Sequence, residues 1–131
     1  MITLRDIARR LDEEDLKYEF TDGNGIHLGM TGEYRNHSDI FFHTDGDEVT
    51  INILPDITFR NPNMRIMMEI NELNHKYKSY SFYLDEDNDL VMKANAIVSE
   101  NTSTDEVWAL FFRGVRIVDN FYPTVQKLLW S

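Results

Sequence analysis

The sequence predicts a small α+β domain in which a long C-terminal helix packs on an antiparallel sheet. Two observations lead to this prediction. Apolar residues recur with helical spacing in some segments and alternate with polar residues in others. A chain of 131 residues, 42% of them hydrophobic, also has room for one core. We therefore expect a single domain over residues 1–131 with the element order α-ββββ-α-ββ-α.

The first predicted element is an amphipathic helix that begins near Thr3. Thr3 and Asp6 have the spacing of a capping box, in which each side chain binds the backbone amide of the other residue. Apolar side chains then follow with helical spacing, at Leu4, Ile7, Ala8 and Leu11. These residues predict a helix with one buried face.

Two hairpins are predicted next, over residues 17–30 and 40–53. In both segments, apolar and polar residues alternate on either side of a turn that contains glycine. The turns are expected at residues 21–25 and 44–47. A loop over residues 55–60 then leads to a central helix.

The central helix is predicted to start at Asn61 and Pro62, because asparagine caps a helix and proline is tolerated at its first position. Its sheet-facing side is expected to carry Ile66, Ile70, Leu73 and Tyr77.

Met64 and Met68 fall on the opposite side of that helix. Unbranched methionine adapts to imperfectly matched surfaces, and a symmetric pairing lets one patch cover itself. We therefore expect a homodimer whose interface contains Met64 and Met68. The alternative is that Ile57 and Phe59, in the preceding loop, cover both methionines within one chain.

A third hairpin, over residues 79–98, and a long last helix complete the prediction. Ser103 and Glu106 suggest a capping box at the start of this helix, and an apolar stripe runs from Val107 to the end of the chain. Pro123 predicts a kink or a short break. Trp108 and Phe112 lie to one side of the stripe, where we expect them to be exposed and to bind a partner.

No residue pattern indicates catalysis, a cofactor or a metal. The acidic turn at residues 85–89 resembles the start of a calcium-binding loop, but Leu90 and Ala96 replace the glycine and glutamate that such a loop needs. It is interpreted as a solvated turn. The four histidines are scattered, and nucleophile, phosphate-loop and dinucleotide signatures are absent. The prediction is a protein that is not an enzyme.

The formal net charge of −10 opposes binding to nucleic acid or to an anionic membrane surface, since both need clustered basic residues. A polypeptide partner is therefore expected. The chain has no cysteine, and its first residues are charged rather than apolar like a secretory signal. These features predict a cytoplasmic protein.

Two segments carry a resemblance to a known family. The sequence Asn-Glu-Leu-Asn at residues 71–74 and Tyr-Ser-Phe-Tyr-Leu-Asp at residues 80–85, together with the element order, resemble the bacterial YbjN-like domain from about Leu4 to Leu129. The resemblance implies the fold of type III secretion chaperones, which are small, acidic, dimeric proteins that bind other polypeptides. No catalytic residue belongs to the pattern. Asn71 and Asn74 are expected to tie their helix to neighbouring backbone.

The predicted function is therefore a non-enzymatic, regulatory protein that binds polypeptides, as a chaperone does, through apolar helix surfaces. The alternative is a regulator that binds a small molecule or a metal in a pocket between the sheet and the last helix. That pocket would be lined by Tyr80, Tyr83 and a histidine.

Overall fold

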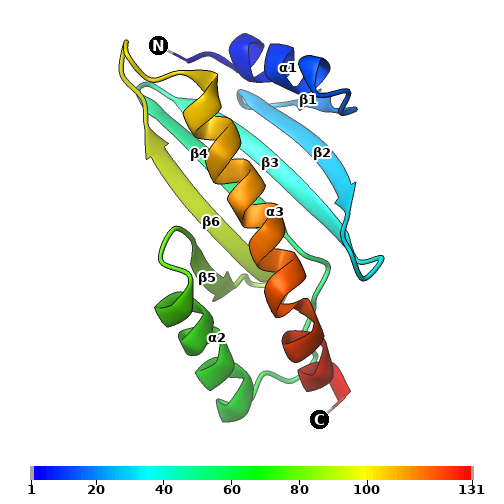
Figure 1. Ribbon diagram of the computed structural model, residues 1–131. Helices are drawn as coiled ribbons and strands as arrows, with labels where there is room; N and C mark the ends of the chain where they lie inside the picture. The colour runs from blue at the N-terminus through cyan, green and yellow to red at the C-terminus, as the bar shows by residue number, and fades with distance from the viewer. Residues whose placement is uncertain (1, 131) are drawn as a thin grey trace.

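The computed structural model describes residues 2–130 and has the predicted α+β architecture (Figure 1). The elements are α1 (Leu4–Glu13), β1 (Glu19–Thr21), β2 (Gly25–Thr31), β3 (His37–Asp45), β4 (Glu48–Leu54), α2 (Met64–Lys76), β5 (Ser81–Leu84), β6 (Leu90–Ile97), α3 (Thr104–Lys127) and the short 3-10 helix η1 (Leu128–Trp130). The six strands form one antiparallel sheet in the order β1-β2-β3-β4-β6-β5. The predicted order α-ββββ-α-ββ-α is confirmed.

The sheet has one face that forms the core. Its cross-strand register aligns apolar residues on that face, as in the row of Ile26, Phe42, Ile51 and Ala94 on neighbouring strands, all of which are buried. α3 lies diagonally across this face, and α1 lies beside its first turns (Figure 1). The intervening residues of each strand point to the opposite face, where most side chains are half-buried or exposed.

Two of the predicted helix starts are confirmed and one is displaced. The capping box forms at Thr3, with hydrogen bonds of 3.3 and 2.8 Å between it and Asp6. Ser103 caps α3 as predicted, but its side chain accepts a hydrogen bond from the Asp105 amide, so the predicted capping box with Glu106 is not formed. α2 is capped by Asn63 rather than Asn61, and the Asn63 Oδ1 accepts a hydrogen bond of 2.9 Å from Ile66. The helix therefore begins two residues after the predicted cap and proline.

α3 continues through Pro123 to Lys127, so of the two predicted outcomes, a kink or a short break, the break is wrong. The residues beyond the proline keep their helical phase because Val125 is buried in the core, and its burial favours continuing the helix. Ile117 is also buried. Within residues 2–130, no helix combines the length and the apolar character needed to cross a membrane.

α3 approaches the sheet closely at Gly114. A Cβ atom there would lie 2.4 Å from Tyr80 Oη and 2.6 Å from Ile53 Cδ1. The Tyr80 hydroxyl donates a hydrogen bond of 2.8 Å to the Leu110 carbonyl, and burial raises the pKa of Tyr80, which keeps this donor neutral.

α2 is attached to the edge strand β5 by Asn74. Its amide group donates a hydrogen bond of 2.9 Å to the Phe82 carbonyl and accepts one of 2.8 Å from the Phe82 amide. The side chain thus replaces a neighbouring strand at the outer edge of the sheet. The predicted backbone-binding role is confirmed for Asn74, whereas Asn71 is exposed on the outer side of α2.

Candidate functional site

A patch of three exposed methionines lies on the outer side of α2. Met64, Met67 and Met68 are 75, 47 and 63% exposed, whereas Ile66, Ile70 and Leu73 on the inner side are buried. We call the three methionines the methionine patch. Met67 extends the pair that was predicted from the sequence.

The loop before α2 does not cover the methionine patch. Ile57 and Phe59 are 1 and 2% exposed and belong to the core, so the alternative in which they cover Met64 and Met68 is wrong. The patch is surrounded on the same helix by polar residues, Arg65, Glu69, Asn71 and Glu72. An apolar centre with a polar border is the usual composition of a protein interface.

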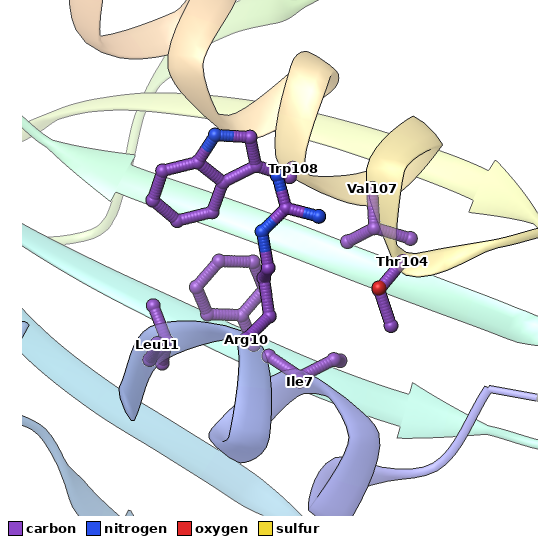
Figure 2. Close-up of a pocket in the computed structure, with 7 residues that line it drawn as sticks. Ile7, Arg10, Leu11, Thr104, Val107 and Trp108 are labelled. Carbon is purple, nitrogen blue, oxygen red and sulfur yellow. The ribbon is translucent and has the colours of Figure 1, made fainter. Parts of the chain in front are cut away.

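The two aromatic residues predicted to bind a partner have different environments. Phe112 is 47% exposed. Trp108 is half-buried, because the Arg10 guanidinium of α1 lies over its ring at 5.2 Å and the Phe111 ring lies 5.1 Å away. Figure 2 shows Arg10 reaching from α1 towards Trp108 on α3. The expectation of an exposed Trp108 is therefore wrong, since this side chain joins the two helices.

Arg10 is held in place by carboxylates on both helices. Its guanidinium lies 3.2 Å from Glu14 and forms a second ion pair with Asp105. These contacts raise the pKa of Arg10, chiefly through the hydrogen bond to Asp105. A fixed cation over the indole ring stabilises the contact between α1 and α3. Trp108 still supports Phe112, whose ring centroid is 6.4 Å away.

The structure does not contain the predicted pocket lined by Tyr80 and Tyr83. Tyr80 packs against α3, whereas Tyr83 points to the opposite face of the sheet and is exposed. The cavity between α1, α3 and the sheet, lined by apolar side chains and Arg10, has a volume of about 10 Å³. That is room for about one water molecule. A small-molecule site formed by these tyrosines is therefore wrong.

The face of the sheet opposite the core carries a cluster of histidine and carboxylate groups that was not predicted from the sequence. The His27 Nδ1 lies 3.0 Å from Glu19 on β1, and its Nε2 lies 2.9 Å from Asp39 on β3. His37 Nε2 lies 3.2 Å from the same Asp39 oxygen. The His27 ring also stacks on Phe41 at 4.7 Å. The protonated His27 can donate to both carboxylates and so ties the short edge strand β1 to β3.

These contacts predict a pH-dependent stability. The hydrogen bonds to Asp39 and then Glu19 hold the pKa of His27 above its usual 6.5, and those from His27 and then His37 hold the pKa of Asp39 below 3.8. The His27 contribution is complete below pH 6.5 and is lost as the pH rises through the higher folded-state pKa. The Asp39 contribution is present above pH 3.8 and is lost as the pH falls through the lower folded-state pKa.

The free energy of unfolding should therefore differ most between the parent chain and a His27→Gln variant at pH values between 3.8 and 6.5. Denaturant titrations at a series of pH values measure this difference. It should shrink as the pH rises above 6.5. A difference that stays constant from mildly acidic to mildly alkaline pH would contradict the assigned contacts.

The acidic turn brings carboxylate oxygens of Asp85, Asp87 and Asp89 within 4.8 Å of one another. Asp85 Oδ1 accepts hydrogen bonds from the Asp87 and Asp89 amides, at 2.9 and 3.0 Å, and Asp89 accepts one from the Thr58 hydroxyl. Two of the three carboxylates therefore hold the turn and its neighbouring loop. These contacts account for the acidic residues as parts of a hairpin turn.

Comparison with known proteins gave one family match and two similar solved structures. Residues 3–127 match the model of the YbjN family, described as "Putative bacterial sensory transduction regulator". Among solved structures, the chain is similar to YbjN from E. coli, titled "a putative transcription regulator", with a TM-score of 0.66, 13% identity and coverage of 94% of this chain and 93% of that one. It is also similar to a chain of the ExsC–ExsE complex, with a TM-score of 0.57, 9% identity and coverage of 88 and 90%.

A search of curated protein sequences gave no match. The two structural similarities concern the fold, because both identities are low. The family match extends over nearly the whole chain and over both segments on which the resemblance was based. The predicted YbjN-like, chaperone-like fold is confirmed, and the chain belongs to the YbjN family.

Proposed function

We propose that this chain is a single-domain, non-enzymatic regulatory protein that binds a polypeptide and acts as a homodimer. The observation that carries the proposal is the methionine patch on α2, an apolar surface that no other part of the described chain covers. A chaperone-like role fits the family and the similarity to a chain of the ExsC–ExsE complex. The net charge of −10 favours a polypeptide over a nucleic acid as the partner.

In the proposed dimer, the methionine patches of two chains face each other across a two-fold axis. A two-fold interface uses the same surface on both subunits, so one patch suffices. If the two α2 helices run antiparallel about the methionine patch, Arg65 of each chain lies near Glu69 and on the side of Glu72 of the other helix. Opposite charges would then border the apolar centre.

The polypeptide would bind at Phe112, supported by Trp108, on α3. This surface is separate from the methionine patch, because α2 lies beside the C-terminal half of α3, whereas Trp108 and Phe112 belong to its N-terminal half (Figure 1). A dimer through α2 therefore leaves both copies of the aromatic site accessible.

The oligomeric state tests the proposal. Light scattering at several concentrations should report a dimer for the parent chain and a folded monomer for the Met64→Glu, Met68→Glu variant. The two glutamates would place like charges opposite each other in the interface, at a cost of several kcal/mol.

A matched control is Asn101→Asp with Gln126→Glu, which adds the same charge at exposed positions outside the methionine patch. This variant should remain dimeric. A parent chain that is monomeric at high micromolar concentration would refute the dimer, and so would a Met64→Glu, Met68→Glu variant that remains dimeric.

A further inference from the structure

The outward side of α3 carries a surface that combines an aromatic ring with arginines. Ala109, Phe112, Arg113 and Arg116 are all exposed and have the spacing i, i+3, i+4 and i+7, which places them on one side of the helix. We call these four residues the α3 patch. α3 lies in front of the sheet (Figure 1), and the buried residues Phe111, Gly114 and Val118 lie on the other side of the helix from the α3 patch.

The α3 patch is locally basic although the protein is acidic. Asp105, one turn before Ala109, forms an ion pair with Arg10. Asp119, which follows the patch, accepts a hydrogen bond of 3.0 Å from the Glu33 amide. Among residues 2–130, no carboxylate lies within ion-pair distance of the Arg113 or Arg116 guanidinium. Two arginines without an ion pair therefore flank an exposed phenyl ring. Of the acids nearest to them along the helix, Asp105 and Asp119 are engaged elsewhere, and Glu106 is exposed two turns before Arg113.

We propose that the α3 patch binds an acidic segment of the partner polypeptide, which places an apolar side chain against Phe112 and carboxylates against Arg113 and Arg116. This inference rests on the proposed polypeptide-binding function and specifies the chemistry of its partner. Guanidinium groups bind carboxylates through paired hydrogen bonds. Aromatic and arginine residues also contribute most of the energy in many protein interfaces.

The charge of the α3 patch and of the whole chain favours an acidic polypeptide over two other possible partners, a second copy of the chain and a nucleic acid. A second copy of the chain, docked patch to patch, would bring the arginines of both copies together, which is repulsive. A nucleic acid needs a larger cluster of basic residues than two arginines on a chain with a net charge of −10. An acidic polypeptide can place an apolar side chain against the Phe112 ring and carboxylates against Arg113 and Arg116.

The test uses two synthetic amphipathic helical peptides labelled with fluorescein. They share the same leucine and phenylalanine positions, and the remaining positions are glutamate in one and lysine in the other. Fluorescence anisotropy should show that the parent chain binds the glutamate peptide at least about tenfold more tightly, which corresponds to about 1.4 kcal/mol. Arg113→Glu with Arg116→Glu should reverse this preference, and Phe112→Ser should weaken binding of both peptides.

Arg5→Glu with Lys17→Glu is the control, because it changes the total charge equally at exposed positions outside the α3 patch. It should keep the preference of the parent chain. The inference is overturned by a parent chain that binds neither peptide or prefers lysine, or by a preference that survives Arg113→Glu with Arg116→Glu. If both peptides bind equally and Phe112→Ser abolishes binding, polypeptide binding stands and the acidic specificity fails.

Discussion

Phe111→Ala is expected to lower the free energy of unfolding by about 3–5 kcal/mol, because it empties a large, fully enclosed site in the core. The Phe111 side chain is 0% exposed. Its ring centroid lies 5.4 Å from that of Phe42 on the sheet and 5.1 Å from that of Trp108 on α3. The substitution therefore removes contacts on both sides of the helix–sheet interface. Chemical denaturation followed by circular dichroism measures the loss.

Phe112→Ala is the matched control, since it removes the same side chain from the next position, where the ring is 47% exposed. Surface substitutions usually change stability by about 0.5 kcal/mol or less. Equal losses for Phe111→Ala and Phe112→Ala would contradict the assignment of one ring to the core and the other to the partner surface.

Gly114→Ala is expected to destabilise the protein by about 1–3 kcal/mol, although alanine is normally the better helix former. The added methyl group would meet the Tyr80 hydroxyl oxygen and Ile53 Cδ1 at distances that real Cβ atoms do not show. Either these side chains or α3 must then shift within the packed core, which also disturbs the hydrogen bond from Tyr80 to Leu110. Thermal and chemical denaturation both report this change.

The reverse substitution at an exposed position of the same helix separates packing from helix propensity. Ala109→Gly should destabilise by about 1 kcal/mol through propensity alone. If Gly114→Ala instead stabilises the protein by a similar amount, α3 does not approach the sheet as closely as the contact at Gly114 requires.

The order of elements could be predicted because it depends on local periodicity. The boundaries that were wrong depend on choices that local sequence leaves open. Asn61 and Asn63 are both suitable caps, and in the structure the Asn63 side chain accepts the hydrogen bond from the Ile66 amide. Pro123 is tolerated inside α3 because Val125, in the following turn, is buried in the core.

Among the candidate site residues, too, those that depend on local spacing were predicted and those that depend on contacts distant in the sequence were not. The exposure of Met64 and Met68 followed from helical spacing and is confirmed. Trp108 was misjudged because Arg10, far away in the sequence, covers it through a contact between two helices. The cluster of Glu19, His27 and Asp39 needs three strands in register. The only available signal was the alternation of His37, Asp39 and Phe41 on one face of a strand.

A unique cysteine tests the central claim, the homodimer through the methionine patch, most directly. The natural chain has no cysteine, so Met64→Cys or Met68→Cys introduces a single thiol. A disulfide requires Cα atoms within about 7 Å of each other. At least one of these variants should form a disulfide-linked dimer under mild oxidation, much faster than the control Phe112→Cys. Linkage no faster than in the control for both variants would contradict the account.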